Sequence, residues 1–270
     1  MHTTAERMYL VAETSLPPLL VLCFMHAYLQ SAVYNMIGSW TVDNGSGSAN
    51  WIAHNLVVIA FDVATVFIAV LSTCDGSVSA LGETPRTRLY GHSTQFDMLC
   101  RLTVAFETYN TFVTAVIFRD EHIFTVHHIC TLFLAFAATV PYAHYYGLFF
   151  FGLANVSSAL LATFTLFDAL RMKYPLFDTP YRVSRTAFGI VFLVVRCDVW
   201  LVLSVFFWLD NVEALRGDWS HSAPVTVVVL GANLFLTSLQ FFWGSKVVSG
   251  IRKHFNATDT HGRNQLSKQL

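Results

Sequence analysis

The chain has 270 residues, of which 54% are hydrophobic and only 12% are charged, and its formal net charge is −1. A soluble domain carries about 25% charged residues, so this composition cannot cover a surface that faces water. High hydrophobicity also excludes intrinsic disorder, and the near-neutral charge gives no basis for binding nucleic acid. The class that remains is an all-α membrane protein with several spans.

Seven apolar stretches are long enough, at roughly 20 residues each, to cross a bilayer as helices. They are continuous rather than alternating, which favours a helical bundle over a barrel. In chain order the predicted spans are 16–37, 52–72, 98–118, 123–140, 145–170, 187–209 and 224–243.

The connections between these spans predict their neighbours and orientation. The segments 119–122 and 141–144 are very short, so the third, fourth and fifth spans are expected to be adjacent and antiparallel, whereas 73–97 is a long polar loop. Seven spans place ten Lys and Arg residues on one side and four on the other. The positive-inside rule therefore predicts a lumenal or external N-terminus and a cytosolic C-terminus.

The five cysteines form no CxxC pair and no regular spacing. They therefore indicate neither a zinc site nor a disulfide framework, and we expect them to be small buried apolar side chains. No metal site is predicted.

Polar side chains inside the spans are the main functional signal, because each ionisable group costs about 2.5–3.5 kcal/mol to insert at the centre of a bilayer. Such groups persist where they face a cavity or a partner. The set comprises His26, Asp62, Glu107, Asn110, His127, His128, Asn155, Asp168, Arg196, Asp198, Asn233 and Gln240.

Depth and helical spacing select a cluster from this set. Glu107 and Asn110 share one helical stripe, and both lie near mid-membrane depth together with Asn155 and Arg196. The adjacent pair His127 and His128 lies nearer the predicted cytosolic end; each histidine reaches Thr131 at helical spacing, and Ser158 shares a face with Asn155. We therefore predict a polar cavity at mid-membrane depth that opens past two histidines, with Glu107 paired to Arg196.

The order of these motifs resembles the TLC family, which includes TRAM, the ceramide synthases and the protein defective in one neuronal lipofuscinosis. An aromatic-amide pair, Tyr109-Asn110, precedes a short charged turn, and His127-His128 opens the next helix. A Gly-aromatic helix carrying Ala154–Ser158 follows, and Arg196 lies deep in a later helix. The resemblance covers 89–253, which leaves two spans and a polar loop in 1–88 and a polar tail in 254–270.

The resemblance implies an endomembrane bundle, expected in the endoplasmic reticulum, that binds or modifies lipids with acyl chains. It also implies that His127 and His128 act as acid, base or acyl-accepting groups, in which case acyl-CoA would be a substrate; no bound cofactor is expected. An imidazole suits this chemistry because it titrates near neutral pH. Homo-oligomer formation is left open.

The chain departs from the ceramide synthases in lacking two expected carboxylates. Asn110 stands where the aromatic-Asp pair has its acid, and the stretch Ala154–Ser158 contains no acidic residue. A carboxylate normally orients a catalytic imidazole, and only Glu107 or Asp168 could supply one here. The chain therefore resembles the shorter TLC-domain proteins more closely.

Two functional hypotheses follow, and the sequence leaves open whether the protein is an enzyme. The first is an acyl-lipid-binding protein that acts in membrane lipid homeostasis, and the second is an N-acyltransferase that uses acyl-CoA and a sphingoid base. A di-iron enzyme is less favoured because His122, His127 and His128 offer too few ligands in the wrong register. A receptor or transporter is less favoured because no inverted repeat is visible.

Overall fold

The computed structural model describes residues 4–37, 48–74, 76–119 and 122–266, and this part of the chain is helical throughout, without a strand. The predicted all-α class is therefore confirmed. The elements are α1 (Thr4–Ile37), α2 (Ala49–Cys74), α3 (Ser77–Leu81), α4 (Pro85–Tyr90), α5 (Thr94–Phe112), η1 (Val113–Phe118), α6 (His122–Ala137), α7 (His144–Gly147), η2 (Leu148–Leu153), α8 (Asn155–Arg171), η3 (Pro175–Phe177), α9 (Asp178–Phe192), η4 (Leu193–Val199), α10 (Trp200–Arg216) and α11 (Ala223–Leu266).

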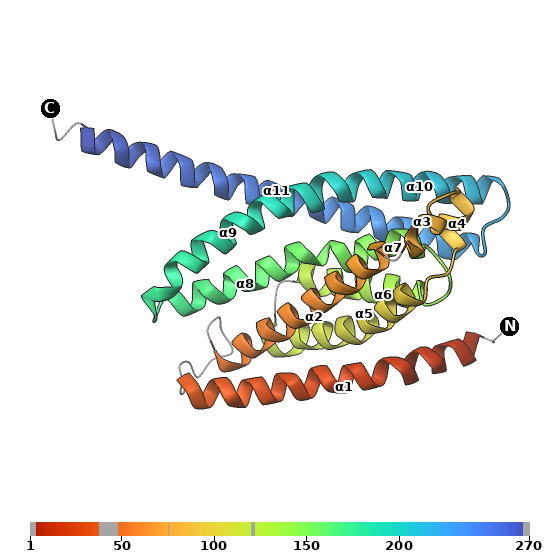
Figure 1. The fold of residues 1–270 in the computed structure, drawn as a ribbon, viewed down its shortest axis with the longest axis horizontal. Coiled ribbons are helices and arrows are strands. Elements are labelled where there is room, and N and C mark those ends of the chain that lie inside the picture. Colours follow the sequence, from red (N-terminus) through yellow and green to blue (C-terminus); the bar gives the residue numbers. More distant parts are fainter. Residues whose placement is uncertain (1–3, 38–47, 75, 120–121, 267–270) are drawn as a thin grey trace.

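The long helices lie roughly along one common axis and successive rods alternate in direction (Figure 1). Each rod after α2 is interrupted only by a short turn or by a π-helical segment, so α5–η1, α7–η2–α8 and α9–η4–α10 are each nearly continuous. The long α11 projects past the bundle beside the α8–α9 end (Figure 1).

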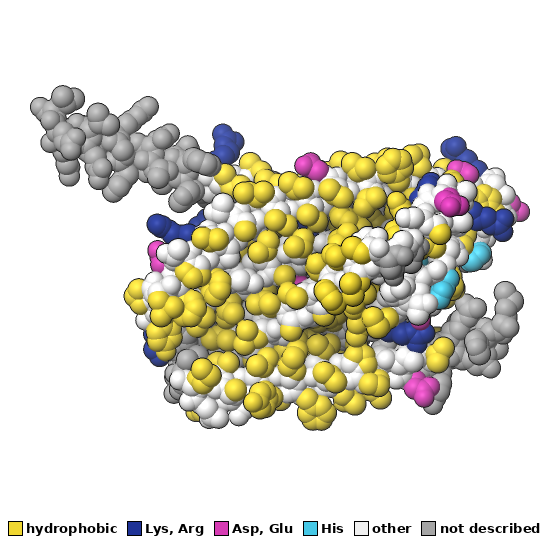
Figure 2. All heavy atoms as spheres, viewed as in Figure 1, with side chains coloured by type: hydrophobic (Ala, Val, Ile, Leu, Met, Phe, Trp, Pro, Cys, Tyr) yellow, Lys and Arg dark blue, Asp and Glu magenta, His cyan; other side chains and the backbone are white. Residues whose placement is uncertain are grey.

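Five stretches in the described residues are long and apolar enough to cross a membrane: Leu10–Met36, Ala49–Cys74, His144–Arg171, Pro175–Arg216 and Ala223–Arg252. A shorter apolar helix, His122–Ala137, is α6. Each of the seven ranges predicted from the sequence overlaps a helix, but the count of seven spans and the orientation of the termini remain predictions. Apolar side chains cover most of the face in view, whereas the charged side chains on this face lie mainly towards its two ends (Figure 2).

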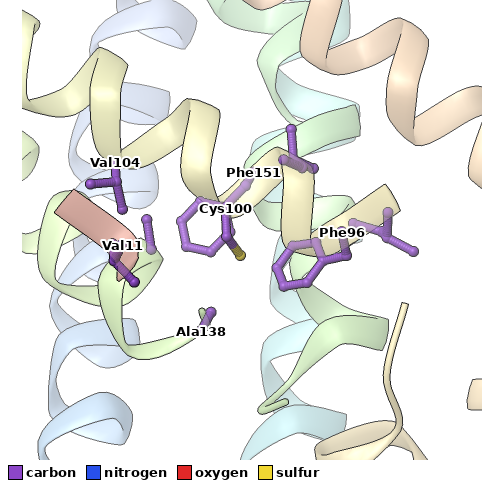
Figure 3. Packing of buried hydrophobic residues seen from close by; sticks show 9 residues of the cluster. Val11, Phe96, Cys100, Val104, Ala138 and Phe151 are labelled. Carbon is purple, nitrogen blue, oxygen red and sulfur yellow. The ribbon is translucent and has the colours of Figure 1, made fainter. Parts of the chain in front are cut away.

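The core lies between helices rather than in one central layer. Val11 of α1 packs with Val104 of α5 and Ala138, close to Cys100 and Phe151 (Figure 3). A second cluster joins further residues of α1, α2 and α5. The first helix is therefore part of the packed bundle.

The neighbours of α8 differ from those expected from the short connections. The expected packing of α5 against α6 is present, but the main partners of α8 are α2 and α9 rather than α6. The absence of a side chain at Gly152 explains this, because a Cβ on Gly152 would lie only 2.5 Å from the Cβ of Ala69. This close approach holds the η2–α8 rod against α2, so that α6 and α8 face each other across a cavity.

The polar connection predicted as one long loop contains two short helices instead. Thr84 and Thr87 form a reciprocal capping box at the start of α4, with Pro85 in the first turn, a combination that favours helix initiation. Arg88 of α4 then forms a two-point ion pair with Asp210 of α10, both contacts measuring 2.7 Å. This pair holds α4 over one end of the bundle.

Candidate functional site

A cavity of about 550 Å³ lies inside the bundle, and its lining comes from α2, from α5 to α11 and from the π-helical segments between them. The volume falls in the range typical of small-molecule sites. All eight predicted site residues line it: Glu107, Asn110, His127, His128, Thr131, Asn155, Ser158 and Arg196. The structure thus brings the predicted cluster together around one hollow.

The cavity has a polar part and an apolar part. The histidines and carboxylates lie towards the end where α8 meets α9. Towards the α4 end the lining is apolar, with Phe96, Ala138, Phe150, Phe207 and Val229 among its residues. Along α6, the ten residues from His128 to Ala138 span about 15 Å. The shape is therefore that of a long pocket with a polar head and an apolar extension.

His128 is held by a buried carboxylate on the neighbouring helix. Its Nδ1 lies 2.8 Å from Oε2 of Glu107, and the two side chains are 15% and 9% exposed. The amide nitrogen of Asn110 lies 3.2 Å from Nδ1 and 3.3 Å from Nε2 of the same ring. With Nδ1–H donating to Glu107, Nε2 is the ring nitrogen that can accept from this amide, so the imidazole is held by the carboxylate on one side and by the amide beside it.

His127 is less constrained than its neighbour. Its ring lies 5.1 Å from that of His128 and 5.3 Å from that of Trp243, in edge-to-face geometry. Its Nδ1 is buried without a hydrogen-bond partner among the described residues. Thr131 donates its hydroxyl to the backbone carbonyl of His127 at 2.9 Å rather than to an imidazole. Of the two histidines, His127 is therefore the one with a ring nitrogen available to a ligand.

Arg196 is held by hydroxyl groups instead of by the direct ion pair that the sequence predicted. Its Nε and Nη2 donate to the hydroxyls of Ser157 and Ser158, both at 2.9 Å, and its guanidinium lies over the ring of Trp200 at 5.3 Å. No ion pair joins Arg196 to Glu107 among the described residues, because the nearest partner of Glu107 is His128.

The guanidinium of Arg196 nevertheless shares the cavity lining with two carboxyl groups, those of Asp62 and Glu107. Asp62 of α2 is 3% exposed, and its Oδ2 has no hydrogen-bond partner among the described residues. The buried cluster thus combines one guanidinium, two carboxyl groups and two imidazoles. Asp62 is the site residue that the motifs missed. Its signal was an acid deep in an apolar span, but that span lies before the region covered by the resemblance.

π-helical segments adjoin the site on three rods. η1 contains Thr114, η2 directly precedes Asn155, and η4 contains Arg196. A π-helical turn adds a residue, widens the helix locally and is frequently found at functional sites. Asn155 then donates to Thr65 and to the carbonyl of Phe151, both at 3.0 Å, so it joins α8 to α2.

The long apolar helices around the cavity define a multi-pass α-helical membrane protein. The described His, Cys, Asp and Glu side chains form no group of three suited to a metal ion. The chain belongs to the TLC domain family, whose model matches residues 50–249. This match begins earlier than the motifs indicated and includes α2. No curated protein and no solved structure matches the chain.

Proposed function

We propose that this TLC-domain protein binds lipids with acyl chains in its intramembrane cavity and acts in membrane lipid homeostasis. The observation that carries the proposal is the division of one cavity into a polar part around Glu107, His127 and Arg196 and an apolar extension towards Ala138. An amphiphile matches this division, with its head group among the polar side chains and its acyl chain along the extension.

Unpartnered polar atoms on the lining residues support an occupant. In the described part of the chain, such atoms occur on five lining residues: Asp62, Asn110, His127, Asn233 and Gln240. A buried polar group without a hydrogen bond costs roughly 1–3 kcal/mol. A lipid head group, alone or with water, would supply the missing partners.

The test is mass spectrometry of lipids that co-purify with the protein. Replacing Ala138 by Phe would fill the apolar extension, so we expect a shift towards shorter acyl chains. Replacing His127 by Ala would change head-group composition or reduce occupancy. The matched control is Val202→Phe, since Val202 is 54% exposed on the outer face of α10. Identical lipid profiles in all four proteins would contradict the proposal.

A second function, N-acyl transfer from acyl-CoA to a sphingoid base, is favoured by one specific contact. The sequence lacks the acids expected from the ceramide synthases, yet Glu107 approaches His128 to 2.8 Å from a different helix. A carboxylate beside an imidazole is the arrangement that orients a catalytic histidine. In such a reaction the amine attacks the thioester carbonyl, an imidazole accepts the amine proton, and the thiol of CoA leaves.

Turnover decides between the two functions. Purified protein would be incubated with acyl-CoA and a sphingoid base, and both the amide and free CoA would be measured. The acyltransferase function predicts equimolar products that are lost in His127→Ala and in His128→Ala and strongly reduced in Glu107→Gln. Absence of turnover in protein that still carries lipid would support binding alone.

Three further features are proposed with this function. The protein would reside in the endoplasmic reticulum or another endomembrane, with the basic α8–α9 end in the cytosol. It is also proposed to be closest to the shorter TLC-domain proteins, and self-association is compatible with it. Protease protection of epitope-tagged termini in sealed microsomes would test the orientation.

A further inference from the structure

A second polar cluster lies where α1, α2 and α5 meet, beside the cavity. His26 of α1 is 7% exposed, Tyr109 of α5 is 4% exposed and His54 of α2 is 9% exposed. The hydroxyl of Tyr109 lies 2.5 Å from Nδ1 of His26 and 3.1 Å from Nδ1 of His54. Nε2 of His26 lies 2.6 Å from Oδ1 of Asn50. Two imidazoles therefore share one phenol hydroxyl.

Counting the available hydrogen atoms shows which group donates in each of these hydrogen bonds. Oδ1 of Asn50 can only accept, so Nε2 of His26 carries the hydrogen and donates to it. No described carboxylate forms an ion pair with His26, and in the neutral ring Nδ1 then accepts from the hydroxyl of Tyr109. The hydroxyl has one hydrogen, so Nδ1–H of His54 must donate to the Tyr109 oxygen.

The same count leaves Nε2 of His54 as an unprotonated acceptor. Nε2 has no hydrogen-bond partner among the described residues. His54 lines the cavity whereas Tyr109 does not, so the edge that carries Nε2 is the edge left for the cavity. Its surroundings there are Trp51, Asn55 and the ring of Phe118, whose centroid is 5.3 Å from that of His54.

Most other buried polar atoms of the lining that have no partner are also hydrogen-bond acceptors. Four of them are oxygen atoms that can accept hydrogen bonds: Oδ2 of Asp62, Oδ1 of Asn110, Oδ1 of Asn233 and Oε1 of Gln240. The two hydroxyls nearest Arg196 already accept from its guanidinium. Among the buried side-chain atoms of the described lining that have no partner, acceptors therefore predominate.

We propose that the cavity selects lipids whose head group donates hydrogen bonds, and that Nε2 of His54, oriented by the Tyr109–His26 chain, accepts from a head-group hydroxyl. This inference rests on the proposed lipid-binding function and adds the class of head group. A phosphate head group would bring negative charge towards the carboxyl groups of Asp62 and Glu107, and two nitrogens of the Arg196 guanidinium already donate to Ser157 and Ser158, so phosphate is disfavoured. Tyr109 and His26 are positioning residues.

The test compares a lipid that has a free head-group hydroxyl with the same lipid methylated at that hydroxyl and with a phosphate lipid. Dioleoylglycerol, its 3-O-methyl ether and dioleoyl phosphatidic acid are each added in detergent, and bound lipid is counted by native mass spectrometry. We expect wild-type protein to prefer dioleoylglycerol over the methyl ether by roughly 5–30-fold, the range for one buried hydrogen bond. His54→Phe would lose that preference, whereas His221→Phe, at an exposed histidine, would keep it.

The tautomer of His54 can be measured separately, and it tests the proposed orientation of the imidazole independently of lipid binding. In protein labelled with ¹⁵N-histidine, the imidazole signals missing from His54→Phe belong to His54. We expect protonated Nδ1 and unprotonated Nε2, and Tyr109→Phe would reduce both this distinction and the lipid preference while the acyl chains of bound lipid stay unchanged.

The outcomes separate the two proposals. Equal binding of dioleoylglycerol and its methyl ether, or a protonated Nε2 on His54, would overturn the head-group inference while lipid binding itself stands. Preference for phosphatidic acid would overturn it as well. If no lipid binds to wild-type protein, both the inference and the proposed function fail.

Discussion

The contact between Glu107 and His128 gives the sharpest quantitative prediction. Nδ1 of His128 and Oε2 of Glu107 are 2.8 Å apart, and both side chains are largely buried. A hydrogen bond to a charged group contributes about 1.5–3 kcal/mol, but pairwise couplings inside membrane proteins average about 0.6 kcal/mol with a maximum near 1.7. Within the described residues no acid lies closer to His128 than Glu107, so we expect a coupling free energy of about 1–2 kcal/mol for this pair.

A double-mutant cycle measures this coupling. The free energy of unfolding would be determined in mixed micelles of mild detergent and dodecyl sulfate for wild type, Glu107→Gln, His128→Gln and the double variant. The matched control is Glu213→Gln, because Glu213 is exposed on α10. Its effect should stay below about 0.5 kcal/mol, as is usual for an exposed surface substitution.

One result of the double-mutant cycle would contradict the prediction. If the two single substitutions add within about 0.3 kcal/mol, the residues are energetically independent. In that case the carboxylate does not hold the imidazole, and the observation that favours acyl transfer loses its basis.

Three further substitutions test other contacts. Replacing Arg196 by Gln removes the charged hydrogen bonds to Ser157 and Ser158 and should cost about 1.5–3 kcal/mol in unfolding free energy, with no cost at all refuting the account. Gly152→Val should cost about 1–3 kcal/mol and be partly rescued by Ala69→Gly; absence of rescue would place the strain elsewhere. Hydrogen bonding to Asp210 raises the pKa of Arg88 above its already high ordinary value, so the stabilisation is present throughout the acidic and neutral range and is lost only in strong base. Arg88→Gln should therefore lower the melting temperature equally at about pH 6 and pH 9, and a loss confined to one pH would contradict this sign.

The sequence predicted the helical class and the approximate position of every long helix because apolar length is a strong local signal. It did not predict which helices pack together. Short connections indicated that α6 and α8 are direct neighbours. Instead, the missing side chain at Gly152 and the small one at Ala69 allow the η2–α8 rod to pack closely against α2. Likewise, the capping residues that form α4 were overlooked inside a segment treated as polar loop.

Depth and spacing were sufficient to collect the members of the site but not to pair them. All eight predicted residues line the cavity, since polar groups inside a membrane are costly to expose to lipid and therefore face the interior of the bundle. Partner choice depends on helix rotation, which the sequence pattern does not fix. As a result Glu107 was assigned to Arg196, whereas the structure pairs it with His128. Their proposed catalytic and lipid-binding roles stay predictions.

The contribution of α1 has a consequence for how this protein is divided. The family match begins at residue 50, yet His26 of α1 completes a hydrogen-bond chain with Tyr109 and His54, and Val11 and Leu22 pack into the core. A fragment trimmed to the matched region would keep every motif by which the family is recognised. It would also lose the α1 side chains that pack against α2 and α5, so the segment that identifies the family is shorter than the segment that forms the packed core.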